Sequence, residues 1–181
     1  MSAVFVTGAV GVGKSTLLGR VIEACGPFRK IYGFRTKKIP GGKSCSGAGR
    51  VYIYPAMEQL VMDDAHCVGE VFARQGCNMH SEVFENLGVE LLSGIPEGSI
   101  VLMDELGFLE SASPKFCNKI MELINGDYLI LGAIKPRNLP LLNSVREHPG
   151  TKLFEITELN RTLASDVVIN AFKAELAAKK S

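Results

Sequence analysis

Apolar residues follow two different spacings along the chain, and the two spacings alternate. Short apolar runs typical of strands cover residues 3–7, 30–36, 50–54, 99–103, 128–134 and 152–156. Apolar residues at helical spacing cover residues 14–26, 81–92, 113–125 and 165–179. Strands that alternate with helices predict an α/β fold, in which a mostly parallel sheet has helices on both faces.

The segment 36–54 combines turn signals with the end of one expected strand and the start of the next. Within it, residues 39–49 hold four glycines and a proline, which predicts a mobile loop. We therefore expect a hairpin that carries positive charges on a glycine-rich loop. Residues 55–80 show no clear period, and no linker divides the chain, so we expect a single domain over residues 1–181.

The composition is that of an ordinary globular protein and excludes several classes of chain. Apolar residues make up 46% and charged residues 22% of the 181 residues, which argues against disorder. No apolar run approaches the roughly 20 residues of a membrane-spanning helix. No basic stretch precedes an apolar run at the amino end, as it would in a signal peptide. We therefore expect a cytoplasmic protein with no membrane partner.

The cysteines favour reduced thiols over a disulfide framework. There are five, an odd number, and none has CxxC spacing. The segment with His66–Cys67, Cys77 and His80 carries residue types that bind zinc. It lacks the paired spacing of a zinc site, so we favour ordinary thiols there.

Charge is distributed unevenly, although the net charge is only +1. No acidic residue lies between Glu23 and Glu58, whereas residues 58–127 carry 13 acids. The positive charges in the gap belong to Arg29, Lys30, Arg35, Lys37, Lys38, Lys43 and Arg50. Such a block can be a solvated face, a neighbour of the acidic segment in the fold, or a surface for phosphate or nucleic acid. Of these three, we favour the solvated face.

A glycine-rich segment directly after the first expected strand matches the phosphate-binding pattern GxxxxGK[ST] at every position. It consists of Gly8, Ala9, Val10, Gly11, Val12, Gly13, Lys14 and Ser15. Its backbone N–H groups and the start of the next helix are expected to cradle the phosphates of a nucleoside triphosphate. Lys14 then reaches the β- and γ-phosphates, the Ser15 hydroxyl binds Mg²⁺, and Thr16 lies beside the α-phosphate.

Two carboxylates follow the apolar strand 99–103, at the edge where open α/β sheets bind ligands. We expect Asp104 to hold Mg²⁺ opposite Ser15, and Glu105 to orient a water molecule for attack on the γ-phosphate. An arginine that neutralises transition-state charge would help this reaction. Three arginines follow or approach the ends of expected strands: Arg35, Arg137 and Arg161. The pattern thus predicts a Mg²⁺-dependent hydrolase with Glu105 and Lys14 as its catalytic residues.

Four segments of the chain together resemble the THEP-type nucleoside-triphosphatase family, which includes the cancer-related nucleoside-triphosphatases. They are Val6–Leu17, Gly33–Thr36, Met103–Gly107 with Glu110, and Thr157 with Asn160–Arg161. The resemblance implies a three-layer, RecA-like P-loop NTPase fold and slow, Mg²⁺-dependent hydrolysis of several nucleoside triphosphates, including ATP and GTP. It also implies that Glu105 is the catalytic carboxylate and that Asn160 and Arg161 lie near the nucleotide. The chain departs from the family pattern at Lys38, Pro40 and Phe108.

Two other functions could use the same phosphate loop. A small-molecule kinase would employ Asp104 or Glu105 as the base for an acceptor hydroxyl, and it would need a second pocket, for which the sequence shows no motif. A regulatory module could instead control a partner through its nucleotide state, with nucleic acid as a candidate partner for residues 29–50. We rank the hydrolase first, the regulatory module second and the kinase third, and nucleic acid is not the favoured partner.

Overall fold

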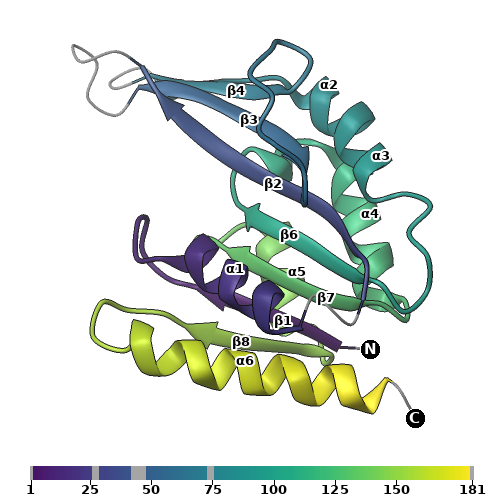
Figure 1. The fold of residues 1–181 in the computed structure, drawn as a ribbon. Coiled ribbons are helices and arrows are strands. Elements are labelled where there is room, and N and C mark those ends of the chain that lie inside the picture. The colour runs from purple at the N-terminus through teal and green to yellow at the C-terminus, as the bar shows by residue number, and fades with distance from the viewer. Residues whose placement is uncertain (1, 26–28, 42–47, 73–75, 180–181) are drawn as a thin grey trace.

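An eight-stranded sheet runs through the molecule (Figure 1). The computed structural model describes residues 2–25, 29–41, 48–72 and 76–179. The strands are β1 (Ser2–Thr7), β2 (Ile31–Pro40), β3 (Gly49–Pro55), β4 (Cys67–Phe72), β5 (Gly76–Met79), β6 (Ile100–Leu106), β7 (Leu129–Ile134) and β8 (Thr151–Glu155). The helices are α1 (Lys14–Cys25), α2 (Ser81–Val83), the π-helical turn η2 (Phe84–Gly88), α3 (Val89–Leu91), the 3₁₀ turn η3 (Glu110–Ala112), α4 (Pro114–Asn125), α5 (Pro140–Glu147) and α6 (Arg161–Ala178). Within the described ranges, every helix is too short or too polar to span a lipid bilayer.

The sheet has a parallel part and an antiparallel part, in the order β5-β4-β3-β2-β6-β7-β1-β8. The strands β2, β6, β7, β1 and β8 pair in parallel, and β3, β4 and β5 add to β2 in antiparallel fashion. The strand β2 belongs to both parts. Its residues 31–35 pair with β6, and its residues 34–40 pair with β3. The sheet is therefore mostly parallel, with a hairpin extension at one side.

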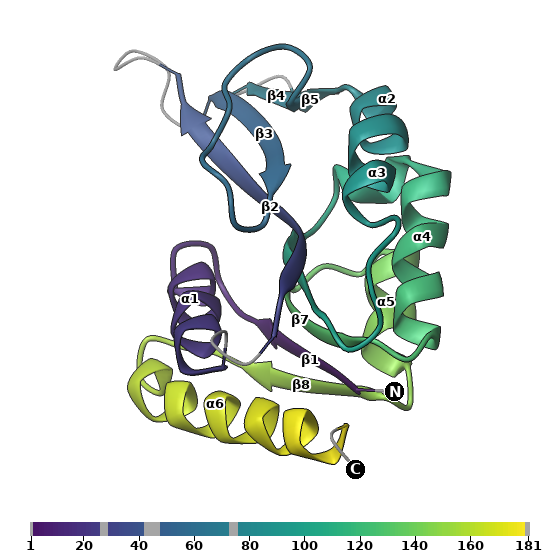
Figure 2. The ribbon, with the colours of Figure 1, turned by 45° about the vertical axis from the view of Figure 1, so that its right-hand side comes forward.

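Helices cover both faces of the sheet (Figure 2). The helices α1 and α6 pack on one face, where Leu18 and Phe172 join a cluster of strand residues that includes Leu131. The segment α2–η2–α3 packs on the other face together with α4 and α5, and both clusters are closed to solvent. These layers confirm the predicted three-layer α/β fold.

Three phenylalanine rings connect β2 to the helices of the second face. The ring of Phe116 on α4 lies 5.3 Å from that of Phe34 on β2 and 4.9 Å from that of Phe84 in η2, centroid to centroid. All three side chains are fully buried. Because aromatic rings bury large apolar areas, this cluster is a main stabilising contact between the strand shared by both parts and the helical layer.

The expected hairpin is present, but its first strand is longer than predicted. The strand β2 continues to Pro40, whereas we expected a loop from Ile39 onward. Pairing with β3 explains the difference, since Ile39 lies opposite Arg50 in the ladder. Residues 42–47 of the expected loop, and the expected helix end at Gly26, lie outside the described residues.

Other elements were missed or misplaced by the sequence pattern. Residues 55–80 contain β4 and β5, which are short, and three of the four residues of β5 are exposed or nearly so, which removes any apolar alternation. The helix α5 was not predicted and has only eight residues. The helix α6 begins at Arg161 rather than at residue 165, because Thr157 and Asn160 form a reciprocal cap before it.

Part of the positive block lies against the acidic segment. Arg50 on β3 pairs with Asp64 at 2.8 Å and with Glu70 at 3.0 Å, and Arg35 pairs with Asp104 at 3.3 Å. Arg35 therefore fits the second interpretation, a neighbour of the acidic segment, whereas Arg50 pairs with acidic residues while its side chain stays 41% exposed. Lys37 is exposed on β2, in keeping with a solvated face, and Lys43 lies outside the described residues.

Candidate active site

The predicted phosphate loop connects β1 to α1 and curls around the side chain of Lys14. The Lys14 Nζ donates hydrogen bonds to the carbonyl oxygens of Gly8 and Ala9, both at 2.9 Å. Gly8 has φ +149°, and a Cβ atom there would lie 2.2 Å from the carbonyl oxygen of Ile156, so the loop packs on the end of β8. Ala9, Val10 and Gly11 are exposed, which leaves the outer side of the loop open to a ligand.

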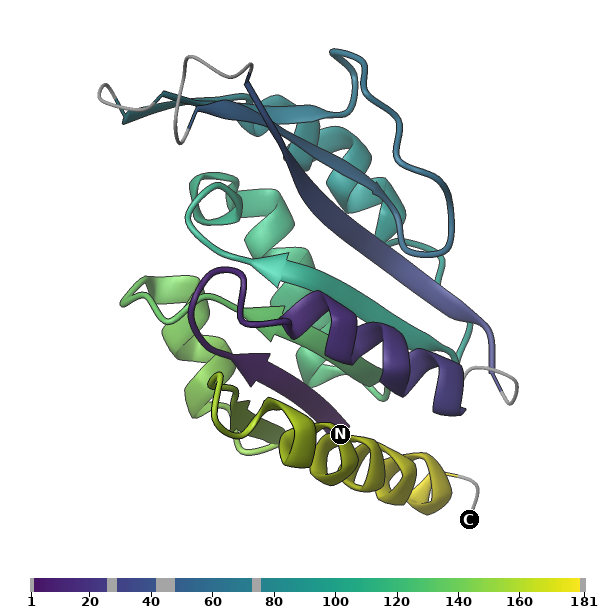
Figure 3. The same ribbon diagram turned by 60° about the vertical axis from the view of Figure 1, so that its left-hand side comes forward.

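Asp104 and Glu105 at the end of β6 face this loop, as the sequence predicted. The hydroxyl of Ser15 donates a hydrogen bond to Asp104 Oδ1 at 3.0 Å. The Nζ of Lys14 lies 3.3 Å from Glu105 Oε1. Figure 3 shows the carboxyl ends of β1 and β6 on one side of the sheet, where the phosphate loop also lies. Lys14, Ser15, Thr16 and Glu105 line a cavity of about 250 Å³ together with Gly11 and Gly13.

Residues of the strand β2 also contact Asp104 and Glu105. The guanidinium of Arg35 donates to Asp104 Oδ2 at 3.3 Å and to the carbonyl oxygen of Ala56 at 2.9 Å. The hydroxyl of Thr36 accepts the backbone N–H of Glu105 at 3.3 Å. Gly33 permits this approach, because it has φ +100° and a Cβ atom there would lie 2.1 Å from the carbonyl oxygen of Leu102. The segment 33–36 therefore contacts the carboxylate of Asp104 and the backbone of Glu105.

The charge of Asp104 is set by two opposing effects. The residue is 2% exposed, and burial raises the pKa of its carboxyl group. The hydrogen bond from Ser15 and the positive charge of Arg35 act in the opposite direction on that pKa. Bringing a cation to Asp104 favours the carboxylate form, so this buried position suits a group that binds a metal ion.

The oxygen atoms of Ser15 and Asp104 fit Mg²⁺ in kind. Mg²⁺ prefers oxygen ligands and is commonly held by one or two carboxylates together with substrate phosphates, rather than by a closed protein cage. Among the residues that the structure describes, no three His, Cys, Asp or Glu side chains gather closely enough to hold a metal ion by themselves. The adjacent hydroxyl and carboxylate therefore match the ion that the sequence predicted.

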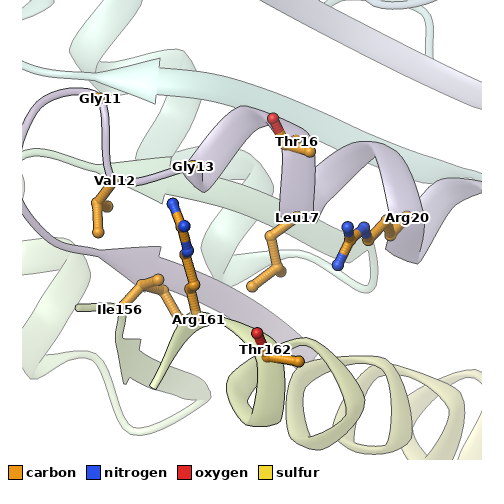
Figure 4. Close-up of a pocket in the computed structure, with 9 residues that line it drawn as sticks. All are labelled: Gly11, Val12, Gly13, Thr16, Leu17, Arg20, Ile156, Arg161 and Thr162. Atoms are coloured by element: carbon orange, nitrogen blue, oxygen red, sulfur yellow. The ribbon is translucent and has the colours of Figure 1, made fainter. Parts of the chain in front are cut away.

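A second cavity of about 460 Å³ opens beside the phosphate loop, between α1 and the start of α6 (Figure 4). Its floor is apolar, with Leu17 and Ile156, and Thr162 lies opposite α1. Arg161 points from α6 toward the glycines of the loop, and Arg20 reaches in from the second turn of α1. The volume lies in the range of small-molecule sites.

The predicted site residues outside the loop have different positions. Arg161 lines the larger cavity, as expected for a residue near the nucleotide. The side chain of Asn160 instead holds the turn before α6, where it accepts the N–H of Thr157 at 2.8 Å and donates to the carbonyl oxygen of Glu155 at 3.0 Å. The carbonyl oxygen of Arg137, in the loop after β7, accepts a hydrogen bond from Arg146.

Sequence reasoning missed Arg20, Thr162 and the role of Thr36. Arg20 follows Thr16 by four residues on α1, so its position one helical turn away was a usable signal. Thr162 could not be found in this way, because it reaches the cavity only through the packing of α6 on α1. Thr36 belongs to a recognised segment, but its bond to Glu105 depends on the pairing of β2 with β6.

Comparison with known proteins shows the family of the chain. The sequence model of the NTPase family matches residues 3–169. The chain is 28% identical to the nucleoside-triphosphatase THEP1 of Methanocaldococcus jannaschii, covering 96% of this chain and 98% of that protein. It is 27% identical to the cancer-related nucleoside-triphosphatase homolog of Bos taurus, covering 87% and 90% respectively.

A solved structure shows the same fold. The crystal structure of THEP1 from Aquifex aeolicus superimposes with a TM-score of 0.71 at 22% identity, over 93% of this chain and 96% of that one. On the sequence match, the chain belongs to the NTPase family with the THEP1-type enzymes, and it is a nucleoside-triphosphatase.

Proposed function

We propose that the protein hydrolyses nucleoside triphosphates, including ATP and GTP, to the diphosphate and phosphate in a Mg²⁺-dependent reaction. One observation carries the proposal: Lys14 and Ser15 of the phosphate loop directly face Glu105 and Asp104, at 3.3 Å and 3.0 Å. A loop that binds phosphates and a carboxylate that can orient water thus meet in one small cavity. This combination is what water-directed phosphoryl transfer requires.

Different residues would bind the phosphates and the Mg²⁺ ion of the substrate. The backbone N–H groups of residues 8–13 and the amino end of α1 would surround the phosphates, and Lys14 would donate to the β- and γ-phosphates. Ser15 and Asp104 would hold Mg²⁺. A bound Mg²⁺ ion supplies positive charge that stabilises the phosphate oxygens during transfer. Thr16 lines both cavities and so lies where the α-phosphate is expected.

Glu105 is the residue that directs water. Its carboxylate would accept a hydrogen bond from a water molecule, whose oxygen forms the new bond to the γ-phosphorus while the bond to the bridging oxygen of the diphosphate breaks. Arg35 would add positive charge beside this centre, because its guanidinium already contacts Asp104. Of the three candidate arginines, Arg35 is therefore our choice for neutralising charge.

The larger cavity would hold the base and sugar. Arg161 and Arg20 can stack their planar guanidinium groups on a base, and Leu17 offers apolar contact. No carboxylate belongs to the described residues that line this cavity, so the acidic partner that would select guanine is missing there. Stacking discriminates weakly among bases. We therefore expect several nucleoside triphosphates to be substrates.

The test is phosphate release by Glu105→Gln, measured with a panel of nucleoside triphosphates and Mg²⁺. We expect kcat to fall by about 10²–10⁴-fold, because the amide cannot accept a proton as the carboxylate does. The dissociation constant of a non-hydrolysable analogue should change by less than about twofold, which marks a role in the transition state only. Lys14→Ala provides the matched comparison and should lose analogue binding as well.

Two results would contradict the proposal. Unchanged turnover in Glu105→Gln would remove the assigned role of that carboxylate. Formation of nucleoside diphosphate that appears only after a small hydroxyl compound is added, with the phosphoryl group transferred to that compound and no free phosphate released, would point to a kinase instead. Release from the wild-type protein with water as the sole acceptor therefore separates the two enzyme classes.

A further inference from the structure

A second acid, Glu110, lies buried just beyond the two carboxylates of the site. It begins the 3₁₀ turn η3, is 4% exposed, and its Oε2 accepts the backbone N–H of Gly107 at 2.7 Å. A buried carboxyl group is costly unless hydrogen bonds compensate it. A glutamate at this position therefore needs hydrogen bonds, and one of them comes from the backbone N–H of Gly107.

That bond closes a short loop between β6 and α4. The carbonyl oxygen of Gly107 accepts the hydroxyl of Ser111 at 3.0 Å, which ties the same residue a second time. The backbone carbonyl of Glu110 accepts the N–H of Ser113 at 3.1 Å and the thiol of Cys117 at 3.3 Å. The loop is thus fixed to the first turn of α4 at one end and to Gly107 at the other.

The same bonds hold the backbone on the far side of Glu105. The N–H of Glu105 donates to the hydroxyl of Thr36, so the near side is fixed by β2. One residue further along, the carbonyl oxygen of Leu106 accepts the N–H of Lys135, and at the next residue the N–H of Gly107 donates to Glu110. Glu105 therefore lies between two anchored points of the chain.

We propose that Glu110 is a positioning residue for Glu105: its bond to Gly107 holds the loop that fixes where the Glu105 carboxylate points. This inference rests on the proposed function, because it assigns a task only if Glu105 directs water. Displacing a catalytic group by about 1 Å can cost roughly 10²-fold in rate. Glu110 does not face the nucleotide cavities, so it should act on turnover and not on nucleotide binding.

Either protonation state of Glu110 can serve, because Oε2 accepts the Gly107 N–H with or without a proton on the other oxygen. Burial raises the pKa of this carboxyl group to about 7, and the hydrogen bond from its own backbone N–H, the charge of Lys135 and the hydrogen bond from Gly107 oppose that rise. Glutamine keeps the length of the side chain and an acceptor oxygen. Aspartate keeps the charge but is one methylene shorter, so it cannot keep both its place in the core and its bond to Gly107.

The experiment compares Glu110→Gln, Glu110→Asp and Glu110→Ala with the wild-type protein. We measure kcat for ATP with Mg²⁺, the dissociation constant of a fluorescent non-hydrolysable ATP analogue, and the thermal unfolding midpoint. We expect kcat to fall by about 10–100-fold in the Ala and Asp variants and by less than about threefold in the Gln variant. Analogue binding should stay within about twofold of wild type in all three. Glu122→Ala, at an exposed glutamate of α4, serves as the matched control.

Three outcomes would overturn the inference. Turnover of the Ala and Asp variants equal to wild type would leave Glu110 with a structural role only. A higher turnover in Asp than in Gln would show that charge, and not the bond to Gly107, is what matters. Weaker analogue binding in proportion to the lost turnover would place Glu110 in nucleotide binding. If Glu110→Ala does not fold, the order of Gln and Asp still decides. Wild-type protein that releases no phosphate would instead refute the proposed function.

Discussion

The central parallel strands β6 and β7 are more deeply buried than the strands of the antiparallel part and than the parallel edge strand β8. All six residues of β7 are buried, and so are all but one of the seven residues of β6. In the antiparallel part, three of four β5 residues are exposed, and β3 is only partly covered. Parallel strands bring their carboxyl ends to one edge, where loops from several strands can meet. The proposed site lies at that edge, and the extension contributes Arg35 and Thr36 only through the strand that both parts share.

The comparison also shows what kind of contact stabilises each part. The parallel part is held by apolar clusters on both faces of the sheet. The extension relies more on pairing across strands and on exposed ion pairs such as Arg50 with Asp64. Buried apolar contacts stabilise much more than exposed ion pairs do. Substitutions in the two parts should therefore differ strongly in effect.

The largest expected effect on stability comes from Phe116→Ala, where the parts meet. The ring contacts Phe34 on β2 and Phe84 in η2, and its loss leaves a cavity. We expect the free energy of unfolding to fall by about 3–5 kcal/mol, and the unfolding midpoint by roughly 10 °C. Chemical denaturation followed by circular dichroism measures the free energy of unfolding, and a thermal scan measures the midpoint. Phe108→Ala, at a half-exposed phenylalanine, is the control, and an equal loss there would contradict the argument.

An intermediate effect depends on pH and on Glu110. Its pKa in the folded protein, about 7, lies above the ordinary value of 4.5 because the group is buried. The stability that this group contributes is therefore complete below about pH 4.5 and is lost as the pH rises through about 7. Glutamine cannot ionise, so the Glu110→Gln variant should not lose stability in this way. The free energy of unfolding of wild type should therefore fall relative to that of Glu110→Gln as the pH rises. From about pH 5 to about pH 8, the difference between the two proteins should grow by about 2–3 kcal/mol in favour of the variant.

Urea unfolding of both proteins at the two pH values measures this difference. Glu122→Gln, at an exposed position, should show no such gain. A constant difference between Glu110→Gln and wild type would mean that the carboxyl group titrates near its ordinary value, and that the loop is more open to water than its burial indicates.

The smallest effect is expected in the extension, for Arg50→Ala. The arginine pairs with Asp64 and Glu70 at the surface, where water screens such interactions. We expect the thermal midpoint to fall by less than about 3 °C, and the shift to shrink further in high salt. Phosphate release should equal that of wild type. A loss comparable to that of Phe116→Ala would show that charge pairs hold the extension in place, and would erase the contrast between the parts.

The sequence predicted the parallel part well because its signals are local. The phosphate loop, the apolar strand before Asp104 and the following helix are each encoded by neighbouring residues. The strands β4 and β5 were missed because short, half-exposed strands depend on partners far away in the chain. The helix α5 was missed even though Pro140 starts it and Leu141, Leu142 and Val145 face the core, since eight residues show barely two turns of periodicity.

The site was predicted to a similar extent and for the same reason. Lys14, Ser15, Asp104 and Glu105 belong to compact patterns, and the structure brings them together. The larger cavity is different, because Arg20 and Arg161 lie about 140 positions apart in the chain and meet only through the packing of two helices. The sequence named Arg161 as an arginine near a strand end and, by resemblance, as a residue near the nucleotide, but it did not predict that Arg20 lines the same cavity.

The shared strand β2 connects the hairpin extension to the backbone of Glu105. Its ten residues form one continuous strand, whose first half pairs with β6 and whose second half pairs with β3 (Figure 1). Thr36, which accepts the N–H of Glu105, directly follows the last residue of β2 that pairs with β6. The strand that carries the extension therefore also fixes the backbone of Glu105, so a displacement of β2 would reach Glu105 without any change in the phosphate loop.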